Sequence, residues 1–133
     1  MKILLTDDIS QRAADLLQGQ GFEVDLIPTP APAELPKFLS RYHGIGVRSA
    51  TKFPADTLAS ATTLKIIVRG GVGVDNIDLK AASENGIAVA NTPGANTIAT
   101  AELTIATMLA LSRNIVPAHQ SLQGGRWERG SFR

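Results

Sequence analysis

The feature that most constrains the fold is a repeated alternation of short, strand-forming apolar runs with segments of helical spacing. Between the runs, apolar residues recur at i, i+3 and i+4, as in residues 13–17 and 35–39. Glycines at positions 21, 44 and 86 stand where helices should end and strands begin. This alternation predicts an α/β fold: a flavodoxin-like parallel five-stranded sheet with helices on both faces. The five runs are Lys2 to Leu5, Glu23 to Ile27, Ile45 to Val47, Lys65 to Val68 and Ile87 to Ala90.

The composition fits a globular protein and excludes several other classes. The chain has 133 residues, 44% of them hydrophobic, and a net charge of +1, so no nucleic acid and no anionic membrane is predicted as a partner. The absence of cysteine excludes disulfides, thiolate catalysis and zinc–sulfur sites. The first residues do not read as a signal peptide, and no uncharged apolar run approaches the roughly 20 residues that cross a bilayer. We therefore expect a cytoplasmic location.

The residues that follow the strands are the candidates for function. In parallel sheets of this kind, ligands bind beyond the carboxyl ends of the strands, near the point where the strand order reverses. Arg48 and Ser49 follow the third run, and Arg69 opens a glycine-rich turn after the fourth. Guanidinium groups bind carboxylate and phosphate with paired hydrogen bonds, so these ends predict an anion site. The alternative is that each arginine pairs with a local acid such as Asp75 or Asp78.

The glycine-rich turn does not have the spacing of a dinucleotide-binding loop. Gly71-x-Gly73 lacks the third glycine of G-x-G-x-x-G, and Asp75 is far too close to be the ribose-binding acid expected about 20 residues further on. We interpret the turn as a concave cradle of backbone N–H groups that suits a carboxylate. Val72 lies at the edge of this cradle. It is the one residue of the chain for which a contact with a cofactor is expected.

The other polar residues near the strand ends, and the two histidines, are not predicted to bind a ligand or to act in catalysis. Asp75 and Asn76 are interpreted as caps for a helix beginning near residue 77 or 78, and residues 91–94 as a turn. His43 and His119 lack the partners of a catalytic triad or a metal site. The adjacent acids Asp7 and Asp8 resemble a magnesium-binding pair, but no metal site is predicted.

From residue 97 onward the pattern changes, because apolar residues occupy nearly every face of a helical segment. Such a helix is expected to be buried all round, and residues 97–123 could extend about 40 Å. Pro117 should kink or break it, and Gly124 with Gly125 should end it. This segment needs more partner surface than a five-stranded domain offers, which implies a second domain or a second subunit.

Several segments taken together resemble D-3-phosphoglycerate dehydrogenases, a branch of the D-isomer-specific 2-hydroxyacid dehydrogenase family. The resemblance implies that residues 1–96 form the substrate-binding domain and residues 97–133 a hinge helix and dimerisation arm. It also implies that a Rossmann nucleotide-binding domain is absent from this chain, as is a C-terminal helix that returns to pack on the substrate domain. The segments are RSATK (48–52), LKIIVRGGVGVDNID (64–78), GIAVANTPGAN (86–96), AE (101–102) and GGRWER (124–129).

The resemblance further implies an activity and a set of binding residues. The parent enzyme would oxidise 3-phosphoglycerate to 3-phosphohydroxypyruvate with NAD, in serine biosynthesis. The backbone at Gly70 and Gly71 would hold the substrate carboxylate, and Arg48, Ser49 and Arg69 would bind the rest of a phosphorylated 2-hydroxy acid. Arg129 would reach the neighbouring subunit's site in a homodimer.

The family's catalytic arginine, glutamate and histidine match no residue here, so no catalytic residue is predicted in this chain. We expect it neither to bind NAD nor to turn over by itself. The alternative function is a non-enzymatic anion-binding or sensor module of the same fold. A phosphoacceptor receiver domain is excluded, since it needs an aspartate ending the third strand and a lysine ending the fifth, where Arg48 and Asn91 stand.

Overall fold

A computed structural model describes residues 1–132; residue 133, the last of the predicted arm, lies outside the described residues. The chain divides into two compact units, Met1–Ala95 and Asn96–Arg133. The roles predicted for the two parts, substrate binding and dimerisation, remain predictions.

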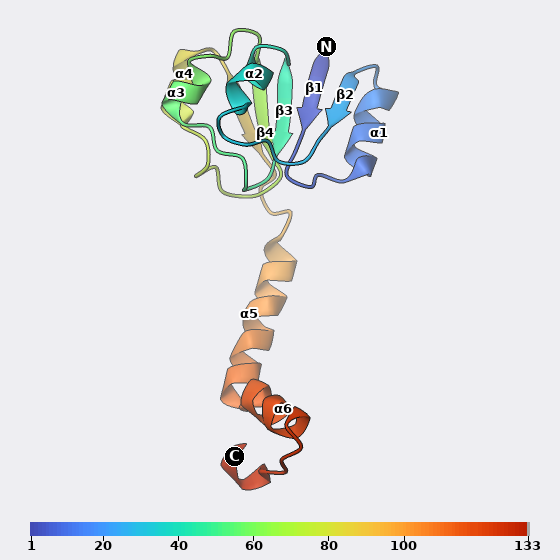
Figure 1. The fold of residues 1–133 in the computed structure, drawn as a ribbon, viewed down its shortest axis with the longest axis vertical. Helices are drawn as coiled ribbons and strands as arrows, with labels where there is room; N and C mark the ends of the chain where they lie inside the picture. The colour runs from blue at the N-terminus through green and yellow to red at the C-terminus, as the bar shows by residue number, and fades with distance from the viewer. Residues whose placement is uncertain (133) are drawn as a thin grey trace. The chain divides into compact units, whose positions relative to one another are not determined.

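The first unit is built on a five-stranded, wholly parallel sheet (Figure 1). Its strand order, β2-β1-β3-β4-β5, is the flavodoxin-like order that the sequence predicts. Each observed strand begins and ends within one residue of the predicted run. The strands are β1 (Lys2–Leu5), β2 (Glu23–Leu26), β3 (Gly44–Val47), β4 (Ile66–Arg69) and β5 (Ala88–Asn91).

The hydrophobic core lies on one face of this sheet, beneath α2 (Leu35–Leu39), α3 (Ala55–Leu58) and α4 (Leu79–Glu84). Successive side chains of a strand point to opposite faces, so every second residue of β1, β3 and β4 enters the core. The loops add Phe53 and Leu64, which are also buried. The strand residues in the core are Leu4, Ile45, Val47 and Ile67.

The opposite face carries α1 (Gln11–Gly19), so the prediction of helices on both faces is confirmed. Within the first unit, however, α1 leaves part of this face open as an apolar groove of about 540 Å³. Parallel sheets are normally covered on both faces, which makes this groove the least protected part of the sheet. The strand residues that line it alternate with those of the core and include Ile3, Leu5, Gly44, Gly46, Ile66 and Val68.

Local signals at helix ends are mostly as predicted, with one correction. Gly21 and Gly86, which follow α1 and α4, have φ of 84° and 68°, the left-handed conformation that favours glycine. The cap of α4 is Asp78, whose carboxylate accepts from the Ala81 amide at 2.9 Å. Assigning the cap to Asp75 and Asn76 was wrong, because α4 begins at residue 79 and only the preceding residue reaches that amide.

The second unit contains α5 (Thr97–Ser112), α6 (Ile115–Gln123) and a 3₁₀ turn, η1 (Arg129–Phe132). The helix breaks as predicted, but at residues 113–114 rather than at Pro117; Asn114 has φ of 49°. The earlier break places Pro117 in the first turn of α6, where its missing N–H would have no helical partner in any case. The helix ends at Gly124 as predicted.

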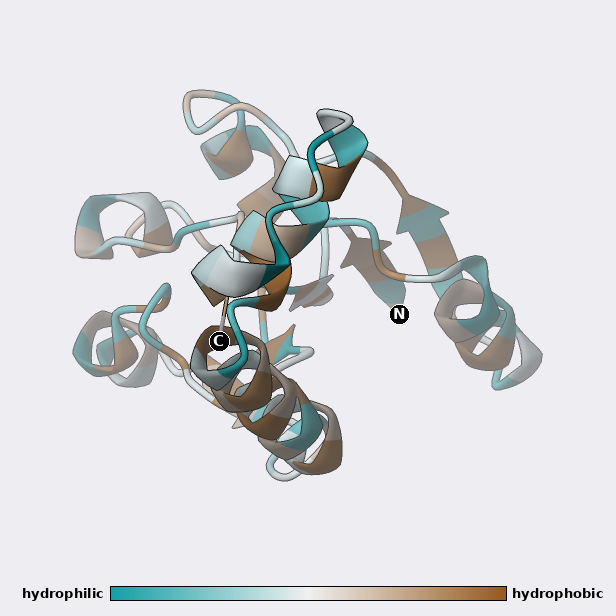
Figure 2. Cartoon of the chain, turned by 90° about the horizontal axis from the view of Figure 1, so that it is seen from below, coloured by the Kyte–Doolittle hydropathy of each residue, from teal (hydrophilic) through white to brown (hydrophobic). Residues whose placement is uncertain are grey.

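Helix α5 is apolar on nearly all sides, as Figure 2 shows by its predominantly brown ribbon. None of its residues is buried among the described residues. Its burial against a further domain or subunit therefore stays a prediction. No helix of residues 1–132 is long and apolar enough to span a membrane.

Candidate anion-binding site at the carboxyl end of the sheet

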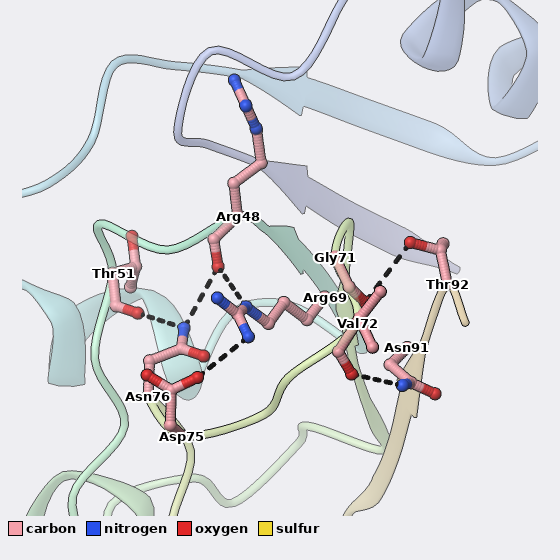
Figure 3. Close-up of polar contacts among 9 residues, drawn as sticks. All are labelled: Arg48, Thr51, Arg69, Gly71, Val72, Asp75, Asn76, Asn91 and Thr92. Carbon is pink, nitrogen blue, oxygen red and sulfur yellow. Dashed lines mark hydrogen bonds and ion pairs between the residues drawn. The ribbon is translucent and has the colours of Figure 1, made fainter. Parts of the chain in front are cut away.

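The loops that follow β1, β3, β4 and β5 meet at the carboxyl end of the sheet (Figure 3). Asn91, the last residue of β5, donates from Nδ2 to the Val72 carbonyl at 2.7 Å. The Thr92 amide donates to the Gly71 carbonyl at 3.0 Å. These bonds hold the glycine-rich turn, residues 70–76, against the end of β5. The structure thus brings together the strand ends that the sequence singled out.

Arg69 contacts its own loop and the backbone of the loop that follows β3. Its Nη1 lies 3.0 Å from the Asp75 carboxylate, and its Nε donates to the Arg48 carbonyl at 3.3 Å. The Arg69 side chain is 13% exposed, whereas that of Asp75 is 85% exposed. This is the pairing with a local acid that the sequence left open as the alternative. A Cβ at position 73 would lie 2.8 Å from Nη1 of Arg69 and 2.9 Å from Oδ1 of Asp75, so a larger residue there would displace this pair of side chains.

Arg48 is exposed, and its side chain points away from Arg69 (Figure 3). The cause is the register of the sheet: Val47 pairs with Arg69, so Arg48 is one residue further along and faces the other way. Arg48 lines the end of the apolar groove instead. Ser49 is exposed beside it. The two guanidinium groups are therefore not together in this structure, although that of Arg69 donates to the backbone carbonyl of Arg48.

The free backbone donors of the turn are not those of Gly70 and Gly71. The Gly70 amide donates to the Val47 carbonyl at 2.8 Å, and the Gly71 amide to the Arg69 carbonyl at 2.9 Å. Within residues 1–132, the amides of Val72 and Gly73 have no hydrogen-bond acceptor, and both residues are exposed. Sequence reasoning missed them as donors because the path of the turn decides which amides are already satisfied.

Asp7 is almost fully buried, at 5% exposure, and its carboxylate accepts from the amides and hydroxyls of the surrounding loops. Burial acts to raise the pKa of Asp7, but hydrogen bonds from Thr51, Thr29 and Arg48 outweigh it, so the pKa lies below its ordinary value. Across the described residues, no cluster of His, Cys, Asp and Glu is arranged to hold a metal ion.

Asn76 is buried and links the two arginine-bearing loops. Its Nδ2 donates to the Arg48 carbonyl at 3.2 Å and to the Thr51 carbonyl at 2.7 Å. Its Oδ1 is buried and has no hydrogen-bond partner among the described residues. Both Asp75 and Asn76 thus have structural roles as expected, but they brace the loops rather than cap a helix.

The remaining candidate residues lie elsewhere in the chain. His43 accepts from the Lys2 amide through Nδ1 at 3.1 Å, which is a contact at the edge of the core. His119 is exposed on α6. Arg129 is the first residue of η1 in the second unit and is exposed there.

Known proteins resemble this chain over nearly its whole length. Residues 3–123 match the family model described as the D-isomer specific 2-hydroxyacid dehydrogenase, catalytic domain. A D-3-phosphoglycerate dehydrogenase of Archaeoglobus fulgidus is 47% identical over 132 residues, which are 99% of this chain and 25% of that protein. The chain spans about a quarter of the length of the curated relatives it matches.

Solved structures agree with this comparison. The TT0316 protein of Thermus thermophilus superposes with a TM-score of 0.87 and 36% identity, over 96% of this chain and 42% of that one. The NAD⁺-bound 3-phosphoglycerate dehydrogenase of Entamoeba histolytica superposes with a TM-score of 0.76 and 32% identity, over 85% of this chain and 39% of that one.

Proposed function

Because the chain belongs to the D-isomer-specific 2-hydroxyacid dehydrogenase family, we propose that it is the substrate-binding part of an NAD-dependent D-2-hydroxyacid dehydrogenase. The proposed reaction is oxidation of 3-phosphoglycerate to 3-phosphohydroxypyruvate, in cytoplasmic serine biosynthesis. The observation that supports it most directly is the carboxyl end of the sheet, where exposed amides and two arginines follow the neighbouring strands β3 and β4. The chain supplies substrate binding and orientation, not the reacting groups.

In this proposal the substrate carboxylate sits at the turn of Gly70 and Gly71. The exposed amides of Val72 and Gly73 are the donors it meets first, since those of the two preceding glycines are already satisfied. Arg48 and Ser49 lie on the neighbouring loop, and the exposed Arg48 side chain can turn toward an anion bound at the strand ends.

Arg69 has the second role, binding the phosphate group. To do so it must exchange its contact with Asp75 for one with the ligand. Asp75 is 85% exposed, so its carboxylate is hydrated when the contact with Arg69 is given up. A doubly charged phosphate is a stronger acceptor than a solvated carboxylate, so the exchange is favourable.

NAD is the proposed cofactor of the parent enzyme, where it accepts a hydride from the hydroxy acid. The glycine-rich turn of this chain does not fit a dinucleotide by itself. The space beside Gly73 is taken by the Arg69 guanidinium and Asp75, and no third glycine lets a helix approach. Val72, which is 46% exposed, is the one residue at which an edge contact with NAD is proposed.

The second unit is proposed to form a homodimer, with Arg129 reaching the partner's site. The support is the exposed apolar surface of α5, which includes Ile98, Leu103, Met108 and Leu111. Monomeric proteins rarely leave so many large apolar residues on one helix in water.

The alternative is a non-enzymatic module that senses a phosphorylated acid with the same loops. It predicts the same anion binding but no gain of activity when a nucleotide-binding domain from the family is joined to the chain. Recovery of NAD-dependent oxidation in such a fusion would exclude it.

An amide-resolved NMR titration with 3-phosphoglycerate, run in parallel with NADH, tests the proposal. We expect saturable shifts at residues 70–73 and at Arg48 and Arg69 with the acid, and none with NADH. A lack of response to the acid would contradict the substrate assignment. Saturable binding of NADH would show that the turn is a nucleotide site.

A further inference from the structure

We propose that Asp7 is a positioning residue: its buried carboxylate fixes the shape of the loop of residues 48–51 and so sets where Arg48 and Ser49 meet an anion. This inference rests on the proposed function for the identity of the ligand, but not for the role of Asp7 in shaping the loop.

Asp7 accepts hydrogen bonds from three backbone amides of one loop. Its Oδ2 accepts from the amides of Arg48 at 3.0 Å, Ala50 at 3.1 Å and Thr51 at 2.9 Å. A loop whose amides converge on one point forms a concave anion site. Here that site is already filled by a carboxylate of the protein itself, so the loop is not the place where an external anion binds through backbone donors.

The other oxygen ties this loop to the ends of the two neighbouring strands. Oδ1 of Asp7 accepts from Thr51 Oγ1 at 2.6 Å, from Thr29 Oγ1 at 3.0 Å and from Thr6 Oγ1 at 3.2 Å. Thr6 directly follows β1, and Thr29 lies in the segment after β2. One carboxylate therefore fastens the loops after β1, β2 and β3 to each other.

The geometry of the backbone supports a dedicated role. Asp7 and Asp8 both have positive φ, 58° and 56°, which costs energy in residues with a Cβ. The strained turn is what points the Asp7 side chain back under the loop of residues 48–51 rather than out to solvent. The six hydrogen bonds that the buried Asp7 carboxylate accepts offset the energetic cost of this backbone conformation.

The consequence for binding follows from what the loop leaves exposed. Because the amides of Arg48, Ala50 and Thr51 turn inward to Asp7, the side chains of Arg48 and Ser49 stay on the exposed side. The Arg48 carbonyl is fixed as well, and it accepts from both Arg69 and Asn76. Releasing the loop would disturb both arginines at once, although Asp7 touches neither guanidinium.

The test uses the full chain with Asp7→Asn, and Asp25→Asn as the matched control. Asp25 is also a hydrogen-bonded carboxylate, held by Tyr42 and Lys2, but its contacts are remote from the loop of residues 48–51. An asparagine at position 7 presents one acceptor and one donor, so it cannot satisfy all six groups. Two quantities are measured by NMR: hydrogen exchange of the Arg48, Ala50 and Thr51 amides, and the dissociation constant of 3-phosphoglycerate.

We expect Asp7→Asn to speed exchange at those three amides and to weaken 3-phosphoglycerate binding by about tenfold, the equivalent of losing charge-assisted hydrogen bonds. Asp25→Asn should leave both quantities within about twofold of wild type. Unchanged affinity in Asp7→Asn, or an equal loss of affinity in Asp25→Asn, would overturn the inference.

Two outcomes separate this inference from its premise. If wild type does not bind 3-phosphoglycerate, the proposed function fails, while the exchange of the three amides in Asp7→Asn still decides whether Asp7 shapes the loop. If Asp7→Asn does not fold, Thr51→Val decides instead. It removes the 2.6 Å bond to Asp7, together with the 3.3 Å contact between the Thr51 and Thr6 hydroxyls, and keeps the amide bonds to Asp7. Binding should weaken measurably but less than tenfold, whereas wild-type affinity would count against the role of Asp7.

Discussion

Arg69 donates a hydrogen bond from Nε to the backbone carbonyl of Arg48 at 3.3 Å, yet the two guanidinium groups point in different directions (Figure 3). Val47 and Arg69 are paired across β3 and β4. Arg48 is the next residue after Val47, so its side chain points to the opposite face of the sheet. One arginine therefore braces the glycine-rich turn from within, and the other remains exposed. In the proposed function the two arginines approach an anion from different sides, and each can be tested separately.

Freeing Arg69 should strengthen binding of a phosphorylated ligand. In Asp75→Asn the ion pair is lost, and because ion pairs open to solvent contribute at most about 1 kcal/mol, affinity for 3-phosphoglycerate should rise by up to about fivefold. Affinity for unphosphorylated D-glycerate should rise less. Asp56→Asn removes the same charge from an exposed site on α3 and serves as the control. An equal gain for both acids, or the same gain in Asp56→Asn, would show that Arg69 is not a phosphate contact.

A methyl group at position 46, on the groove side of β3, should crowd the side chains of Leu5 and Ile9. A Cβ on Gly46 would lie 2.6 Å from Leu5 Cδ2 and 3.3 Å from Ile9 Cδ1. Overpacking of this kind lowers the free energy of unfolding by about 1–3 kcal/mol, so Gly46→Ala should do the same in urea denaturation. Gly19→Ala, with no atom within 4 Å of the added Cβ, should leave stability unchanged or slightly higher. Equal stability of the two variants would mean that Leu5 moves aside freely.

Stability should fall in acid partly through Asp25. Hydrogen bonds from Tyr42 and Lys2 hold the pKa of Asp25 below its ordinary 3.8. A lowered folded-state pKa means that this contribution is present above pH 3.8 and is lost as the pH falls through the lower value. Urea denaturation at a series of pH values should show a shallower acid loss in Asp25→Asn than in wild type. Identical acid slopes would contradict the contribution of Asp25.

The same pair has an alkaline counterpart. Burial, followed by the hydrogen bond to Asp25, raises the pKa of Tyr42 above 10.0. Stability from a raised pKa is complete below the ordinary value and is lost as the pH rises through the folded-state value. Tyr42→Phe should therefore be less stable near neutral pH but lose less stability above pH 10. A parallel decline of the two proteins at alkaline pH would contradict this.

The exposed surface of α5 should drive self-association. Leu103 and Leu111 are 68% and 74% exposed, so Leu103→Glu combined with Leu111→Glu should shift the sedimentation of the chain toward the monomer. Truncation after Asn96 should have the same effect. Leu16→Glu on α1, where the leucine is 64% exposed, is the control and should leave the association unchanged. Wild-type chain that sediments as a monomer would refute dimerisation through this segment.

The sequence by itself determined the architecture of the first unit, because that depends on local and repetitive signals. Short apolar runs, helical spacing between them and glycines at positions such as 21 and 86 indicate each element, and the chirality of the crossovers limits the strand order. The residues at the strand ends follow from the same order. Pro117 similarly signals a break in the last helix, although the left-handed Asn114 marks where it falls.

Only the tertiary structure decided what the residues at those ends do. Whether Arg69 pairs with Asp75, which amides of the turn are left free, and where Asp7 sends its hydrogen bonds all depend on contacts between residues far apart in the chain. Which residues make such contacts depends on the register of the strands and on the path of the loops. A shift of one residue reverses the direction of a side chain, which is why adjacent strand ends carry two arginines that face apart.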